Sequence, residues 1–316
     1  MIQDLQGRKA SAFTHPRWQS GPWKNYIKGP DQKLYDIGAD LTSILASADR
    51  SKLTQGNVAF GSKSLALVQD CRNLEAKLDA WLQEMNGEIP APHYWAQFSN
   101  IANPIDDREN RKMFPISFHF PNIYIAKVLM DYWALSIVVY STSSLIYESF
   151  AGTDRSNRPE QSADDQQTSA WADVPMGDVQ PPLTRAQTLG VTKTLADNIA
   201  QSMEYCLCKD MGMLGPQWTL FALRVALQRY RGFPASIELE WLQAIHVRIC
   251  DEKGVKFSRT IASYKWTNAS SSSGRESHLE TGLRRITGPQ DAFGTRMAAE
   301  SVPIERPASN GYPSST

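Results

Sequence analysis

The stretch from residue 121 to residue 148 constrains the fold most, because it is apolar on nearly every side and has no charged residue between Asp131 and Glu148. A helix that is hydrophobic all round is normally buried by its neighbours. The uncharged part is short for a membrane span and contains several serines. We therefore predict a central core helix here and no membrane-spanning segment.

Other segments carry apolar residues at helical spacing, which predicts amphipathic helices packed around this centre. The stripes are Leu34, Ile37, Leu41, Ile44 and Leu45; Val68, Cys71, Leu74, Leu78, Trp81, Leu82 and Met85; Leu195, Ile199, Met203 and Cys206; Phe221, Val225 and Tyr230; and Trp241, Ile245 and Ile249. Gly87 is expected to end the second helix and Ser236 to cap the last. No alternating strand pattern is persuasive, so the expected fold is an all-α multi-helix bundle.

The composition divides the chain into a folded region and irregular flanks. Residues 1–30 look irregular, and residues 31–266 are expected to form the helical domain. Within it, prolines at 90, 92, 104 and 115 predict a loop region that holds only short helices. Residues from about 151 to 183 are poor in apolar side chains, which predicts a disordered insertion, and residues 267–316 are expected to be a disordered tail.

The charge balance gives no support to nucleic-acid binding by the chain alone. Lysine plus arginine and aspartate plus glutamate both number 33, so the formal net charge is zero, whereas DNA-binding domains usually present a basic face. The N-terminus lacks the apolar core of a secretory signal, and the four cysteines are therefore expected to be reduced intracellular thiols.

Four short tracts stand out when the chain is read in order. The first is Trp18-Gln-Ser-Gly-Pro-Trp23, followed by Asp31 and Leu34-Tyr-Asp-Ile37. The second is Phe120-Pro-Asn-Ile-Tyr-Ile-Ala126, leading to Tyr132-Trp133-Ala134. The third is Ile199-Ala-Gln-Ser-Met-Glu-Tyr205, with Met211-Gly212 and Gly215, and the fourth is Glu240-Trp241 with Gly254. Together they span roughly residues 15–257, and in this order they resemble the regulatory region of fungal zinc-cluster transcription factors.

This resemblance implies a helical domain that regulates transcription and contacts partners. In that family an N-terminal cluster of six cysteines holds two zinc ions and reads DNA, and the helical region lies downstream. Here no C-x-x-C pair occurs, and Cys206-Leu-Cys208 has the wrong spacing. We therefore expect either a truncated gene model or a regulator that works without a zinc cluster of its own.

The acidic run Asp106-Asp107-Arg-Glu109 is the strongest candidate for chemistry, because paired carboxylates suit a magnesium–diphosphate site of the terpene-cyclase kind. The run follows Pro104, and the second metal motif of those enzymes is incomplete, so we interpret it as a solvated loop. Changing Asp106 or Asp107 to alanine should then leave stability almost unchanged, whereas Ile199→Ala should cost on the order of 2–5 kcal/mol.

No catalytic, cofactor-binding or metal-binding residue can be named from this sequence. Its histidines form no metal-binding spacing, and no nucleophile elbow, P-loop or dinucleotide fingerprint occurs. The leading hypothesis is a non-enzymatic transcriptional regulator of a metabolic or secondary-metabolite pathway, in the nucleus or shuttling to it from the cytoplasm. Its partners would be other regulators or a full-length zinc-cluster factor. The alternative is a helical small-molecule binder or enzyme recruited to a biosynthetic pathway, and a small-molecule effector of the regulator also stays open.

Overall fold

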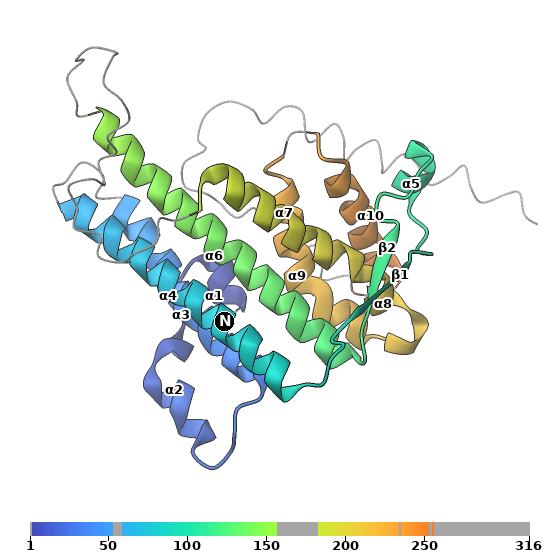
Figure 1. Ribbon diagram of the computed structural model, residues 1–316, viewed down its shortest axis with the longest axis horizontal. Helices are drawn as coiled ribbons and strands as arrows, with labels where there is room; N and C mark the ends of the chain where they lie inside the picture. The colour runs from blue at the N-terminus through green and yellow to red at the C-terminus, as the bar shows by residue number, and fades with distance from the viewer. Residues whose placement is uncertain (1, 53–58, 157–182, 234, 253–254, 256–316) are drawn as a thin grey trace, which may run out of the picture. The chain divides into compact units, whose positions relative to one another are not determined.

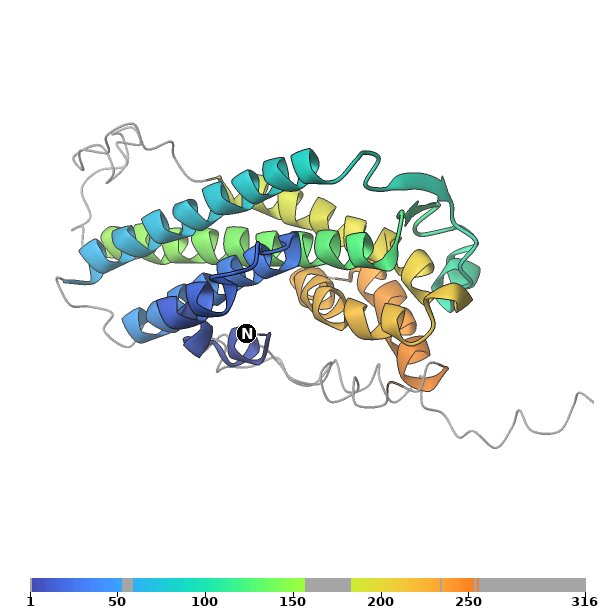
Figure 2. The same ribbon diagram turned by 90° about the horizontal axis from the view of Figure 1, so that it is seen from below.

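The helix α6, Ile123–Ser156, lies at the centre of the fold, as the all-round apolar stretch predicts. In this computed structural model, which describes residues 2–52, 59–156, 183–233, 235–252 and 255, helices pack against α6 from two sides (Figure 1). The helices α3, Pro30–Lys52, and α4, Ala59–Glu88, cover one side. The helices α7, Arg185–Gln201, and α9, Leu214–Tyr230, cover the other (Figure 2).

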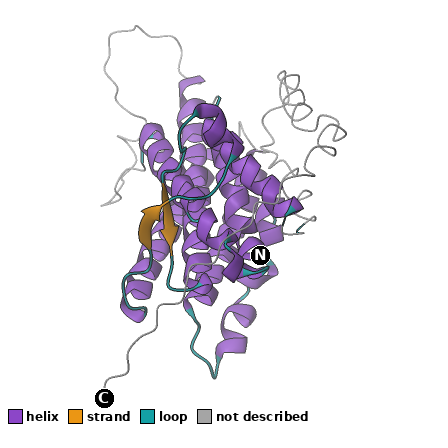
Figure 3. Cartoon of the chain, turned by 90° about the vertical axis from the view of Figure 1, so that its right-hand side faces the viewer, coloured by secondary structure: helices purple, strands orange, loops and turns teal. Residues whose placement is uncertain are grey.

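Shorter elements complete the described part of the chain. Its last long helix is α10, Ile237–Asp251, which packs on α9. The short helices are α1, Ile2–Gly7; α2, Pro16–Ser20; α5, Pro104–Glu109; and α8, Met203–Leu207. Single 3-10 turns lie at η1, Ala12–Thr14; η2, Gly21–Trp23; and η3, Lys209–Met211. Two strands, β1, Trp95–Phe98, and β2, Ile116–His119, pair antiparallel (Figure 3).

The mainly helical fold confirms the prediction, and the apolar stripes face the core. Leu34, Leu41 and Leu45 of α3 are fully buried, as are Ile199 of α7 and Ile249 of α10. Each such side chain contributes about 1.5–3 kcal/mol when it leaves water. Ile199 is 0% exposed, and its helix α7 packs on α6. We therefore still predict that Ile199→Ala leaves a cavity and destabilises the fold.

Two of the long helices begin with the capping chemistry that their sequence provides. The Ser236 side chain accepts from the Leu239 amide at 3.2 Å, as expected for an N-cap. The Asn122 side chain similarly accepts from Ile125 N at 3.0 Å and so caps α6. The expected stop at Gly87 was wrong, because α4 continues to Glu88. The stripe through Ile199 and Met203 belongs to two helices, α7 and α8, that meet at Ser202.

Three regions that were expected to lack long helices compare differently with the structure. Residues 1–30 contain short helices and turns where only irregular chain was expected. The proline-bounded loop holds the pair β1–β2 as well as a short helix, so the expectation of helices alone was wrong there. α6 extends through Ser156, past the point where the expected insertion was to begin. Residues 157–182 of that insertion lie outside the described residues, as does the whole expected tail, residues 267–316.

Candidate functional site

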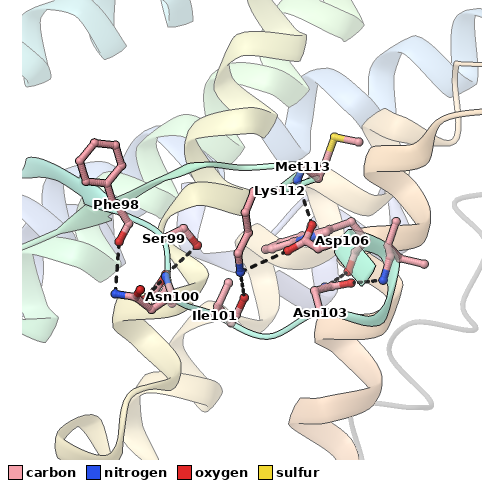
Figure 4. Close-up of polar contacts among 11 residues, drawn as sticks. Phe98, Ser99, Asn100, Ile101, Asn103, Asp106, Lys112 and Met113 are labelled. Carbon is pink, nitrogen blue, oxygen red and sulfur yellow. Dashed lines mark hydrogen bonds and ion pairs between the residues drawn. The ribbon is translucent and has the colours of Figure 1, made fainter. Parts of the chain in front are cut away.

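The acidic run at Asp106 lies in α5, beside the end of the strand pair, and corrects the expectation of a solvated loop (Figure 4). Asp106 is only 7% exposed, and its Oδ1 accepts from Trp241 Nε1 at 3.1 Å and from Met113 N at 2.9 Å. Asp107, one residue later, is exposed. Asp106 is therefore a buried acceptor that joins α5 to α10, while Asp107 fits the original interpretation.

Local sequence explains why α5 forms and points Asp106 inward. Asn103 caps the helix by accepting from Ile105 N at 3.0 Å, and Pro104 occupies the first helical position, where no amide hydrogen is required. Asn110 ends the helix in the left-handed conformation, at φ 49°. The Asn103 amide also donates to Trp241 O at 3.1 Å, so one loop satisfies both the indole and a backbone carbonyl of α10.

Lys112 contacts both a backbone carbonyl and the carboxylate of Asp106. Its ammonium donates to Ile101 O and lies 3.5 Å from Asp106 Oδ2 (Figure 4). The two neighbouring carboxylates therefore differ: that of Asp106 is held by neutral donors and a lysine, whereas that of Asp107 is exposed. No group of three or more His, Cys, Asp or Glu side chains able to hold a metal ion occurs among the described residues.

Glu204 of α8 holds the other side of this loop. Its carboxylate accepts from Ser99 Oγ at 2.8 Å and from Asn100 N at 3.0 Å, which fixes the chain just after β1. A hollow of about 150 Å³, open solvent included, lies beside it and is lined in part by Ser117, Gln201 and Trp241. The hollow leaves no room for a water-sized sphere, so it offers no space for a ligand as it stands.

A second polar cluster lies between α3 and α6 and contains a buried ion pair. Lys127 Nζ is 2.7 Å from Asp131 Oδ2 and also contacts the Tyr35 hydroxyl, while Tyr124 donates to Asp31 Oδ1 at 2.9 Å. Burial raises the pKa of Asp131, and Lys127 offsets this only in part. Burial alone would lower the pKa of Lys127, but Asp131 and Tyr35 together raise it above its ordinary value.

Two cysteine thiols, those of Cys71 and Cys206, are enclosed in the core. Burial raises the pKa of Cys71 to about 12 and raises the pKa of Cys206 further. Cys206 is 0% exposed on the apolar stripe where the sequence placed it, whereas Cys208 is half-buried. His246 of α10 is half-buried, and its Nε2 lies 3.9 Å from Cys250 Sγ.

The first three of the four tracts that carry the family resemblance contact one another across the bundle. Tyr124 bonds Asp31, as above, and the Phe120 and Tyr205 rings lie 5.3 Å apart. Gly215 packs against the Cys206 carbonyl so closely that an added Cβ would lie 1.9 Å from its oxygen. These residues therefore position elements, and none of them forms a site with an open cavity.

The strand β1 presents the most exposed aromatic surface near this loop, and sequence analysis missed it. All four of its residues are exposed, with Phe98 at 82% and Trp95 at 40%, and the preceding Tyr94 is exposed as well. Ser99 N donates to Pro115 O at 2.9 Å, which sets the ladder so that the backbone of Ala96 and Phe98 faces away from β2. The aromatic run between Pro92 and Asn100 was the available strand signal.

Within the described residues the sheet ends at β1. Its far edge therefore carries backbone donors and acceptors that β2 does not use. The Phe98 carbonyl has a long contact, 3.5 Å, from the Asn100 side chain. This open edge, flanked by exposed rings, is the candidate functional site of the molecule.

Among the described helices, α6 contains one stretch, Ile123–Glu148, that is long and apolar enough to cross a membrane by length and composition. Of its most apolar part, 72% is buried in the fold.

Comparison with protein-family models, curated proteins and solved structures finds no match to this chain.

Proposed function

We propose that this chain is a non-enzymatic transcriptional regulator that acts in the nucleus through protein contacts. It would correspond to the helical regulatory domain of fungal zinc-cluster factors and would depend on a partner, such as a full-length zinc-cluster factor, for DNA binding. Two features support the proposal: the order of the four sequence tracts, and the mainly helical fold, in which the first three of these tracts contact one another.

The open edge of β1 is the observation that carries the protein-contact part of the proposal. Exposed edges are templates for pairing with another strand, and proteins usually block them with charges, prolines or bulges. Residues 93–99 contain no charged side chain other than a titratable histidine, and no proline. A partner segment added to β1 would gain backbone hydrogen bonds from Ala96 and Phe98 and apolar contact with the neighbouring rings.

The test fuses the full chain to a heterologous DNA-binding domain and measures transcription of a reporter. Ala96→Pro removes the outward amide hydrogen while leaving the bonds to β2, and Ala96→Val is the matched control that keeps that amide. Phe98→Ser removes an exposed ring, and Leu145→Ser, at a residue 49% exposed on α6, controls for loss of any exposed apolar side chain. Circular dichroism of each variant checks folding.

We expect the wild-type fusion to change reporter output and both control variants to behave like it. Ala96→Pro and Phe98→Ser should lose most of that change while the protein stays folded. A wild-type fusion with no effect on the reporter, or β1 variants as active as wild type, would remove the support for this function.

A further inference from the structure

Residues 13–28, here called the N-terminal arm, project from α3 and are tied to it near their two ends and by one side-chain hydrogen bond between them, from Gln19 Nε2 to Asp40 Oδ1 at 3.2 Å. Just before the arm, Ser11 N donates to the buried Thr42 hydroxyl at 2.8 Å, and at its far end Lys28 pairs with Asp36 of the same helix. Between these points α2, η2 and the following turn extend away from the bundle (Figure 1). The arm therefore presents its side chains with little cover from the helices.

Four large apolar side chains of the arm are exposed. Ile27 is 93% exposed and Tyr26 is 75% exposed, at the turn that leads into α3. Phe13 and Trp18, each about half exposed, meet edge to face with ring centroids 6.0 Å apart. Contiguous exposed apolar side chains mark interaction surfaces in proteins of this kind.

The charge of the same segment has one sign. No aspartate or glutamate occurs between Asp4 and Asp31, whereas this interval contains Arg8, Lys9, Arg17, Lys24 and Lys28. Arg8 and Lys28 are paired with Asp49 and Asp36. Arg17 and Lys24 lie on the exposed surface, and no ion pair joins either of them to a carboxylate of the described residues.

We propose that the N-terminal arm docks an acidic protein segment in which carboxylates are interspersed with apolar side chains. The carboxylates would pair with Arg17 and Lys24, and the apolar side chains would cover Trp18, Tyr26 and Ile27. This surface uses residues other than those of β1, so it is a second contact, beyond the function proposed above.

The number of uncommitted cations favours a protein segment over the other anionic partners. Lipid recognition by basic residues commonly uses clusters of about 4–8 lysines and arginines. Tight nucleic-acid binding neutralises about 6–10 phosphates in well-studied repressor complexes. The arm offers two cations among exposed apolar groups, which is enough to orient a short acidic segment whose apolar residues supply most of the buried area.

The test measures fluorescence anisotropy of a labelled synthetic peptide that alternates aspartate with leucine and phenylalanine, titrated with the full-length protein. Vesicles of phosphatidylcholine with phosphatidylserine, and a labelled single-stranded oligonucleotide, are the competing probes. The variants are Ile27→Ser, which removes the most exposed side chain, and Arg17→Glu with Lys24→Glu, which reverses the charge. Val247→Ser on α10 and Lys209→Glu on η3 are the matched controls, because both residues are exposed and lie outside the arm.

We expect salt-sensitive peptide binding that falls about tenfold or more in Ile27→Ser and in the charge-reversal variant, with both controls unchanged, where tenfold corresponds to about 1.4 kcal/mol. Absence of peptide binding, equal binding by all variants, or arm-dependent binding of vesicles or oligonucleotide in its place would overturn the proposal. Phe98→Ser should keep peptide binding, so failure of the arm and failure of the β1 function give different results.

Discussion

Two polar clusters among the described residues, one around Asp106 and one around Asp131, bury a carboxylate in opposite ways. Asp106 accepts from an indole and a backbone amide, with Lys112 at 3.5 Å, whereas Asp131 is held by the ammonium of Lys127 at 2.7 Å. The first cluster joins segments far apart in the chain, α5 and α10, and the second pins α3 to the core helix α6. A buried ion pair costs desolvation on both sides. Removing one of its partners, or replacing the whole pair, therefore has different consequences from loss of a carboxylate that is held mainly by neutral donors.

Lys127→Met should have the largest effect, because it leaves Asp131 buried without its counter-ion. We expect a loss of about 3–5 kcal/mol in the free energy of unfolding, measured by denaturant titration near neutral pH. The loss should shrink at acidic pH, since protonation removes the uncompensated charge. The double variant Lys127→Met with Asp131→Leu should recover much of the stability, and failure to do so would show that the ion pair is not the source of the loss.

Ile199→Ala is an apolar reference for the substitutions in the two polar clusters, because the Ile199 side chain is fully buried and α7 packs on α6. We expect a loss of about 2–5 kcal/mol from removed methylenes and the cavity they leave. The same denaturant titration measures it. Leu189→Ala, on the same helix at 36% exposure, should cost far less, and equal losses would contradict the packing described.

Asp106→Ala should destabilise the protein by about 2–4 kcal/mol, because it leaves the Trp241 and Met113 donors without an acceptor. Asp106→Asn keeps an oxygen at the same place and should cost less than half as much. Asp107→Ala is the neighbouring control and should lie within about 0.5 kcal/mol of wild type. Equal stability of the Asp106 and Asp107 variants would restore the interpretation of a solvated loop.

Asp106 and Asp107 are neighbours in the sequence but differ in burial, and this difference could not be predicted from local sequence patterns. Periodicity predicted α6 and the buried faces of Ile199 and Ile249, because helical spacing is a local signal. It could not predict the fate of Asp106, whose indole partner lies 135 residues later in the sequence. The local clues that were present, Asn103 before Pro104 and a tryptophan with an indole nitrogen to satisfy, predict a capped turn but identify no partner.

The strand pair was missed for a related reason. Strands of four residues bounded by prolines give too few positions for an alternating pattern to stand out, and β1 has no buried face to alternate with. Its exposure is set by the position of β2 against α7 and α8, which the local sequence does not encode. The candidate site was therefore beyond the reach of pattern analysis, although the helical domain around it was not.

High pH should separate the clusters, because only the α3–α6 cluster contains tyrosines. Burial and the hydrogen bond to Asp31 raise the pKa of Tyr124 to about 12, and burial raises the pKa of Tyr35. Since these folded-state values lie above those of the unfolded chain, the stability they provide is complete below about pH 10 and is lost as pH rises toward 12. Denaturant titrations across this range should show a smaller decline for Tyr124→Phe and an unchanged decline for Asp106→Asn.

Lys33→Ala should have the smallest effect, although Lys33 lies within 3.0 Å of both Glu84 and Glu88 and joins α3 to α4. Partly exposed ion pairs contribute about 0.2–1 kcal/mol and weaken as salt screens them. Titrations at low and high salt should find the difference from wild type only at low salt. A loss as large as that of Lys127→Met would mean that burial does not distinguish the two lysines.

The strand β1 also has a consequence on the timescale of amide hydrogen exchange. Trp95 and Gln97 direct their amides toward β2, whereas Ala96 and Phe98 direct theirs to solvent. Neighbouring amides of one short strand should therefore exchange alternately slowly and quickly, and the two slow amides should exchange only when the strand pair opens locally. Protection from exchange that alternates between successive residues of β1 would then identify its open edge without any knowledge of the partner.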